Sequence, residues 1–145
     1  MPTIRIYKQH RLDEYLDIRR QVFNVEQGID QSIEFDEYDH LGRDDVIHFA
    51  YWHQKKLIAS ARAILLDNRR VKVGRVATLE EYRHKGYASR LMHDIELYFH
   101  NIGFRQVVVN AQVGVADFYK GCGYTAVGEP FLEANILHRK MVKAI

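Results

Sequence analysis

The sequence predicts a mixed α/β fold in which helices cover both faces of one mostly antiparallel sheet. Two observations lead to this fold class. Three apolar, β-prone runs at 46–52, 57–66 and 71–78 follow one another across short polar connections, which is typical of an antiparallel meander. A later β-prone run at 106–111 is reached only through a helix, so it should lie parallel to the strand before that helix.

The composition is that of one compact domain spanning residues 1–145. Of the 145 residues, 47% are hydrophobic and 28% are charged, and a chain of this length builds a core without disulfides. The 21 Lys and Arg against 19 Asp and Glu leave a charge of +2, too small and mixed to predict nucleic acid or an anionic membrane as partner. A single cysteine, Cys122, and no apolar run of about 18–20 residues favour a cytoplasmic protein.

The elements before and after the meander follow from their periodicity. Residues 3–7 alternate like a short strand, and 11–23 place apolar side chains at helical spacing. Residues 24–45 are acidic and irregular, which predicts a loop with one short helix. The remaining predicted elements are a helix from Gly86 to about Asn101, a helix at 113–120, and strands at 124–127 and 136–142.

The segment most suggestive of chemistry is Arg83 to Ala88, which reads Arg-x-x-Gly-x-Ala. It opens a predicted helix with a run of backbone N–H groups, no side chain at Gly86 and only a methyl at Ala88, at the positive end of the helix dipole. This predicts a cradle for a pyrophosphate, aided by the charges of Arg83 and Lys85. Taken alone, a glycine at such a junction is also typical of a simple turn.

A second motif follows some thirty residues later, where the chain reads Phe118-Tyr119 and then Gly123-Tyr124. Together with Arg83 to Ala88 it resembles the GNAT family of acyl-coenzyme A N-acyltransferases, over about residues 71–127. Residues 20–27 and the acidic 34–39 resemble the ElaA-like branch of small prokaryotic members. The resemblance implies a GNAT-type sheet that splays between the strands at 71–78 and 106–111.

The resemblance also implies the activity, which is transfer of an acetyl group from acetyl-coenzyme A to a primary amine by direct attack. A backbone donor near Ala77 would polarise the thioester carbonyl, and Tyr119 would protonate the departing thiolate. The alternative for Tyr119 is an aromatic side chain that only packs. The residues expected to contact the cofactor are Val76, Ala77, Thr78, Arg83, His84, Lys85, Gly86, Tyr87, Ala88, Ser89, Gln112 and Tyr119, with Gln112 standing where the family often has asparagine.

The acceptor side is less defined, because neither splayed strand carries the glutamate that family members often use as general base. Glu26, Glu34 and Asp36 are candidates to bind the amine, small molecule or peptide, and take its proton; otherwise they belong to a solvated loop. The acidic loop hints at a cationic acceptor. Arg75, a candidate substrate residue, either holds a substrate carboxylate or pairs with the acidic loop, as does Arg62.

Other features predict no further chemistry. The eight histidines show no metal-binding spacing, His138 is either structural or a base, and Cys122 is expected to be a small core residue. A coenzyme A-binding sensor or interaction module with the same fold and little turnover remains the alternative function. An RNA-associated domain is a weaker one, because the aromatics near Arg83 form no base-stacking pattern. The family resemblance also allows a homodimer.

Overall fold

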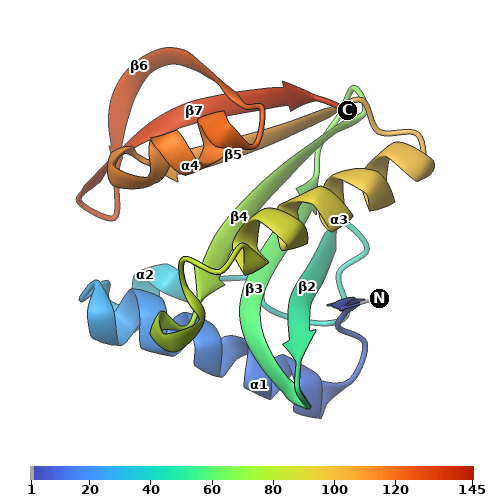
Figure 1. The fold of residues 1–145 in the computed structure, drawn as a ribbon, viewed down its shortest axis with the longest axis vertical. Coiled ribbons are helices and arrows are strands. Elements are labelled where there is room, and N and C mark those ends of the chain that lie inside the picture. The colour runs from blue at the N-terminus through green and yellow to red at the C-terminus, as the bar shows by residue number, and fades with distance from the viewer. Residues whose placement is uncertain (1) are drawn as a thin grey trace.

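The computed structural model describes residues 2–145, and its centre is a seven-stranded sheet with the order β1-β2-β3-β4-β5-β7-β6 (Figure 1). The strands are β1 (Thr3–Arg5), β2 (Val46–His53), β3 (Lys56–Leu65), β4 (Arg70–Thr78), β5 (Gln106–Gln112), β6 (Thr125–Glu133) and β7 (Ile136–Ala144). The α-helices are α1 (Gln9–Arg19), α2 (Gln31–Glu34), α3 (Tyr87–Asn101) and α4 (Ala116–Gly121). Shorter turns are the π-helical η1 (Arg20–Glu26) and the 3₁₀ turns η2 (Glu80–Tyr82) and η3 (Val113–Val115).

The sheet confirms the predicted fold class. β2, β3 and β4 form an antiparallel meander, and β5 pairs with β4 in parallel. The parallel pairing runs only from Arg70↔Gln106 to Val73↔Val109, although both strands continue beyond it. The two strands therefore separate at their carboxyl ends, which is the predicted splay (Figure 1).

Two cores lie on opposite faces of the sheet. On one face the apolar residues of α3, spaced by three or four positions, pack with α4 against the strands; Leu91, Ile95 and Phe99 are fully buried there. On the other face, Leu12, Tyr15, Ile18 and Val22 of α1 and η1 pack against Ala50 and Ala77. None of the helices within residues 2–145 is both long and apolar enough to cross a membrane.

Three elements have boundaries that differ from the sequence prediction by three or more residues. The first helix was expected at 11–23 but continues through η1 to Glu26, because Val22 and Phe23 remain buried across the added turn. The predicted helix at 113–120 begins as η3 and becomes α-helical only from Ala116. β6 runs through Gly128 and Pro130 to Glu133, across a register shift between Val127 and Phe131. As an edge strand with no buried residue it lacks the alternation that marks its length in a sequence.

Candidate active site

The amino end of α3 leaves backbone donors without partners. Gly86 caps the helix in a left-handed conformation with φ of 85°, and the first N–H bonded within the helix is that of Arg90, to the Gly86 carbonyl at 3.1 Å. The N–H groups of the three preceding residues are therefore free of intrahelical partners. His84 also has a positive φ, 61°, whereas Lys85 between it and Gly86 does not. Backbone that alternates in this way turns successive N–H groups toward one point. A Cβ built on Gly86 meets no atom within 4 Å, so the space above this turn is open.

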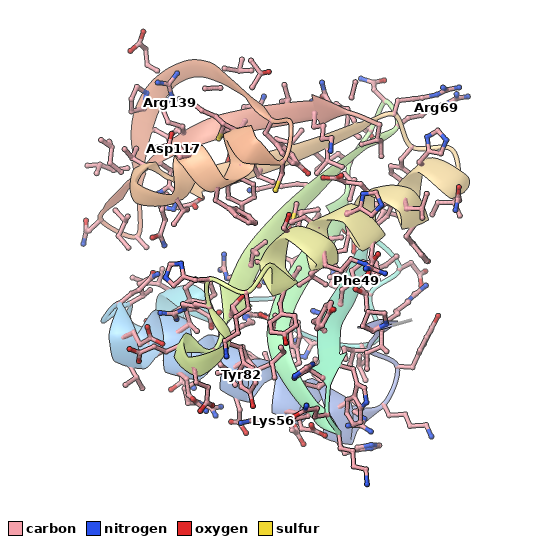
Figure 2. The ribbon with its side chains drawn as sticks, viewed as in Figure 1. Phe49, Lys56, Arg69, Tyr82, Asp117 and Arg139 are labelled. Carbon is pink, nitrogen blue, oxygen red and sulfur yellow. The ribbon has the colours of Figure 1, made fainter. Side chains whose placement is uncertain are left out.

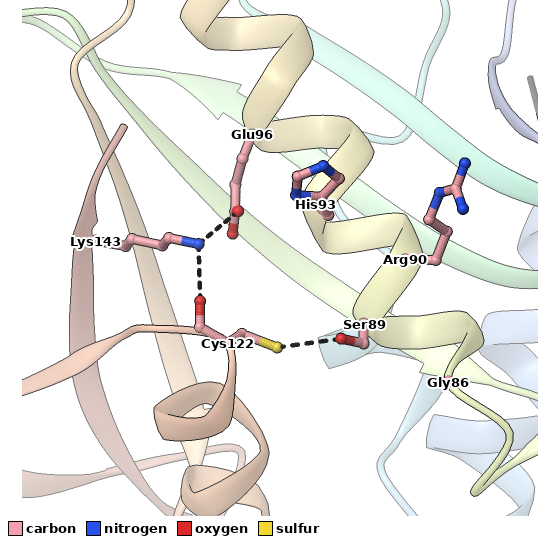
Figure 3. A pocket seen from close by; sticks show the side chains of 7 residues that line it. All are labelled: Gly86, Ser89, Arg90, His93, Glu96, Cys122 and Lys143. Carbon is pink, nitrogen blue, oxygen red and sulfur yellow. Dashed lines mark hydrogen bonds and ion pairs between the residues drawn. The ribbon is translucent and has the colours of Figure 1, made fainter.

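A cavity of about 450 Å³ lies beside this helix start, between α3, the end of α4 and β7 (Figure 3). Cys122 borders it, with its Sγ 3.7 Å from the Ser89 hydroxyl. Cys122 is half-buried on the cavity wall, so the expectation of a core residue is only partly correct, although its side chain does pack against the core. The lining residues are Gly86, Ser89, Arg90, His93, Glu96, Cys122 and Lys143.

Sequence reasoning missed four of these lining residues. Arg90, His93 and Glu96 share one face of α3 with Gly86 and Ser89, a spacing that the printed sequence does show. Lys143 comes from the last strand, and its Nζ donates to Glu96 Oε1 and to the Cys122 carbonyl, both at 2.8 Å. Since only the fold brings Lys143 to α3, no sequence signal identifies it.

Tyr119 lies in α4 with an exposed fraction of 7% and is not among the residues that line the cavity. Its ring packs edge to face on Phe118 and Tyr124, with centroids 5.0 and 5.6 Å away. Burial raises the pKa of the Tyr119 hydroxyl well above its ordinary value, and the neighbouring Cys122 acts in the same direction. The phenol therefore stays protonated at neutral pH, the form that a proton donor requires.

Tyr124 is bound into the same wall. Its hydroxyl donates to Glu96 Oε2 at 2.6 Å, and Glu96 also receives the Lys143 ammonium. Burial, followed by the hydrogen bond and charge of Glu96, raises the pKa of Tyr124 well above its ordinary range. The three side chains join α3, the residue that precedes β6, and β7.

Arg83 and Glu26, two candidate site residues, contact each other. The guanidinium donates to both carboxylate oxygens of Glu26 at 2.9 Å, and its Nε donates to the Thr78 carbonyl at 2.9 Å. Next to Glu26, the Gln27 amide oxygen accepts from Gln112 at 2.8 Å. The end of η1 is thus fixed both to the loop before α3 and to the end of β5.

Three carboxylates of the acidic loop, those of Glu34, Asp36 and Asp39, are paired within the protein. They alternate with three arginines: Arg19 pairs with Glu34 and Asp39 at 2.6 and 2.5 Å, and Arg62 pairs with Asp36 and Asp39 at 2.6 and 3.1 Å. Burial alone would raise the pKa of Asp39, but Arg19 outweighs it and holds that pKa well below its ordinary range.

Arg75 completes this cluster, with its Nη2 3.3 Å from an Asp36 oxygen. The structure therefore shows the ion-pair alternative for Arg62 and Arg75. Glu34 and Asp36, two of the candidate amine-binding residues, are thus paired within the protein.

His138 is buried and held in place. Its Nδ1 lies 2.6 Å from the Ile136 carbonyl, its Nε2 lies 3.5 Å from Glu133, and its ring stacks on Phe131. This geometry gives His138 a structural role and does not identify the general base for the amine. Within residues 2–145 no group of three or more His, Cys, Asp or Glu side chains is arranged to hold a metal ion.

A parallel strand pair that opens at its carboxyl end, followed by a helix whose start presents free backbone donors beside a cavity, defines the fold class of the acyl-coenzyme A N-acyltransferases. The model of the acetyltransferase (GNAT) domain matches residues 21–145. The chain is 30% identical over 141 residues to the uncharacterized protein YyaT of Bacillus subtilis, covering 97% of this chain and 94% of that protein. The chain therefore belongs to the GNAT family of acetyltransferases.

Solved structures agree with this assignment. An acyl-CoA N-acyltransferase from Pseudomonas aeruginosa superposes with a TM-score of 0.85 at 26% identity, covering 99% of this chain and 100% of that one. ElaA of Escherichia coli gives a TM-score of 0.84 at 26% identity, covering 99% of each chain. The same fold occurs, at 16% identity and a TM-score of 0.80, in an aminoglycoside 6'-N-acetyltransferase complexed with coenzyme A, covering 99% of this chain and 97% of that one.

Proposed function

We propose that this protein transfers an acetyl group from acetyl-coenzyme A to a primary amine by direct attack in a ternary complex. The observation that carries the proposal is the set of free N–H groups at the start of α3, beside the 450 Å³ cavity. The neighbouring fold that holds coenzyme A in the aminoglycoside enzyme supports the same ligand here. The bound thioester supplies an activated acetyl group.

The loop before α3 fits a pyrophosphate. The N–H groups of residues 86–89 and the helix dipole favour an anion, and Lys85 is exposed, with no carboxylate partner in the part of the chain described. His84 contributes through its left-handed backbone. Arg83, paired with Glu26, holds the loop against the Thr78 carbonyl rather than adding a free charge. Lys85 thus supplies the cation, and the backbone supplies the cradle.

The opening between β4 and β5 fits the acyl end of the ligand. Beyond Val73, the backbone groups of β4 that point away from β3 have no strand partner. Residues 76–78 hold the pantetheine arm there, Gln112 lines the opposite strand, and a backbone donor near Ala77 polarises the carbonyl as its oxygen gains charge.

The transfer forms one bond and breaks one. The amine lone pair attacks the acetyl carbon, the C–N bond forms, the C–S bond breaks, and Tyr119 donates its proton to the sulfur that leaves. β4 and β5 carry no carboxylate, so the amine proton passes to water or to a group outside these two strands. The acceptor is a small-molecule or peptide amine, and we further propose a single-domain, cytoplasmic protein.

The test is release of thiol from acetyl-coenzyme A in the presence of a panel of amines: amino acids, polyamines, and peptides with a free amino terminus or lysine. Wild type should release thiol with at least one of them. Tyr119→Phe should lower kcat by about a hundredfold and leave acetyl-coenzyme A affinity within about twofold. The control is Tyr98→Phe. The Tyr98 hydroxyl accepts from Arg5 at 3.1 Å, far from α4, so its removal should leave kcat unchanged.

Two outcomes would contradict the proposal. If wild type binds acetyl-coenzyme A but releases thiol with no amine, the protein is a coenzyme A-binding sensor. If Tyr119→Phe lowers affinity and kcat equally, Tyr119 is a packing or binding residue and not the acid.

A further inference from the structure

β4 contains one extra residue at the point where it leaves β5. Ser60 of β3 pairs with Ala77, and Arg62 pairs with Gly74, so two residues of β4, Arg75 and Val76, oppose one of β3. Arg75 is the strained member, with φ of 52°. The last parallel pair with β5 is Val73↔Val109, so this β-bulge lies at the mouth of the opening.

The bulge changes which face each later residue of β4 presents. Val73 and Val76 both pack in the core on the α3 face, whereas Ala77 packs in the core on the α1 face. In a regular strand, Val73 and Val76 would point to opposite faces. The extra residue therefore sets how the backbone of 76–78 is turned toward the opening.

The side chain of Arg75 holds this conformation from outside the strand. Its Nε and Nη2 donate to the Glu34 carbonyl at 3.2 and 2.9 Å, and its Nη2 donates to Asp36 at 3.3 Å. Ser60 Oγ donates to the Arg75 carbonyl at 3.1 Å. A left-handed arginine is unfavourable by itself, so these contacts stabilise a backbone that the local sequence disfavours.

The anchors of Arg75 are themselves fixed. Glu34 is bound by Arg19, which is fully buried, and Asp36 is bound by Arg62, which is 5% exposed. Burial, with the charges of Arg62 and Arg19, lowers the pKa of Arg75, and the carboxylates oppose this. The charge cluster thus connects the α1 face of the sheet to the bulge. The Nε of Arg75 is directed at Glu34 and is not free to bind a ligand carboxylate.

We propose that Arg75 is a positioning residue for acetyl transfer: its ion pairs with Glu34 and Asp36 hold the β4 bulge so that the backbone donor near Ala77 points at the thioester carbonyl. This inference rests on the proposed function, because it names what aims the donor of that site. Arg75 acts through the backbone and does not touch the reacting atoms.

The test separates the side chain from the backbone conformation. Arg75→Gly keeps a residue that adopts positive φ easily but removes the anchors. The matched control is Arg69→Gly, another arginine with positive φ, 56°, in the β3–β4 turn at the opposite end of β4 (Figure 2). The measurements are kcat, KM for acetyl-coenzyme A, and the infrared band of a carbon-13 thioester carbonyl in the bound complex, which needs no acceptor.

For Arg75→Gly we expect kcat at least about tenfold lower, KM for acetyl-coenzyme A within about twofold, and a bound carbonyl band moved back toward its position in free acetyl-coenzyme A. Arg75→Lys, which keeps the charge, should recover part of the loss. Arg69→Gly should match wild type in all three measurements.

A kcat and carbonyl band equal to wild type in folded Arg75→Gly would overturn the assignment and leave Arg75 as a stabilising ion pair only. If wild type itself fails to bind acetyl-coenzyme A, the proposed function fails, and this assignment fails with it. If wild type binds acetyl-coenzyme A and shifts its carbonyl band, cofactor binding is established, and the result for Arg75→Gly alone decides the role of Arg75.

Discussion

The two parts of the sheet on either side of the splay differ in how they are covered. In β3, residues 57–63 are all buried, because α1 packs on one face and α3 on the other. In β6, at the opposite edge, no residue is buried, and Leu132 is 70% exposed. The β1–β4 part is therefore the stable frame, and the β5–β7–β6 part is attached to it through four parallel pairs and side chains such as Lys143.

Because the two parts are covered differently, a ligand can bind at the splay without disturbing the buried core. The cavity is lined by residues of α3, β7 and the end of α4, whereas the buried charges of Arg19, Arg62 and Asp39 lie within the frame. Substitutions among the buried charges of the frame should therefore change stability most, and substitutions in the exposed edge strand β6 should change it least.

The largest effect is expected for Arg19→Met in the frame. It leaves Glu34 and Asp39 buried with one charge partner fewer, which should lower the free energy of unfolding by about 3–5 kcal/mol in urea titrations. The adjacent Arg20→Met is the control, since Arg20 is half-exposed and pairs only with Asp17; its loss should stay below about 1 kcal/mol. Equal losses for the two variants would refute the buried network as the source of stability.

A smaller effect is expected where the parts are joined. Tyr124→Phe removes the hydroxyl that donates to Glu96 at 2.6 Å and should cost about 2 kcal/mol, because hydrogen bonds to charged groups contribute about 1.5–3 kcal/mol. Chemical denaturation monitored by circular dichroism measures this loss. No loss would mean that Lys143 alone satisfies Glu96.

The pH dependence of stability should reflect the frame. Burial lowers the pKa of His48 to about 4, and the charges of Arg19 and Arg62 add to this, although Asp39 opposes it. Between pH 4 and the ordinary histidine value of about 6.5, the unfolded chain holds a proton that the folded protein lacks, so stability falls as pH is lowered.

Replacing His48 removes this contribution. His48→Phe should flatten the slope of unfolding free energy against pH in that window by up to about 1.4 kcal/mol per pH unit. Replacing exposed His10 with glutamine is the control and should leave the slope as in wild type. A slope in His48→Phe identical to that of wild type would assign the acid sensitivity to other groups.

The smallest effect is expected at the outer edge. Leu132→Ala in β6 removes an exposed side chain and should change the free energy of unfolding by less than about 0.5 kcal/mol. A loss above about 2 kcal/mol would show that Leu132 is covered in solution by a second copy, and sedimentation would then detect a homodimer.

The elements of the frame could be predicted from the sequence because the patterns that indicate them are local. The meander at 46–78 and the apolar face of α3 are each contained in one continuous pattern, and both are confirmed. The start of α3 was readable for the same reason, since Gly86 and the donors beside it are consecutive.

Pairing of Arg62 and Arg75 with the acidic loop was one of the alternatives drawn from the sequence, but the individual contacts were not readable, because they join distant parts of the chain. Arg75 and Asp36 are 39 residues apart, Arg83 and Glu26 are 57 apart, and no periodicity indicates which arginine meets which carboxylate. The bulge at Arg75 was equally hidden, since the strand pattern 71–78 reads as continuous. These features depend on tertiary packing and not on local preference.

Calorimetric titration of acetyl-coenzyme A into wild type, Gly86→Glu and Gly103→Glu tests whether the cofactor binds at the start of α3. Gly86 and Gly103 lie at opposite ends of α3, both have positive φ (85° and 98°), and a Cβ on either meets nothing within 4 Å, so the backbone strain of the two variants is matched. We predict saturable binding to wild type and Gly103→Glu and none to Gly86→Glu, where a carboxylate enters the anion cradle. Equal binding to all three proteins would show that the ligand lies away from the start of α3.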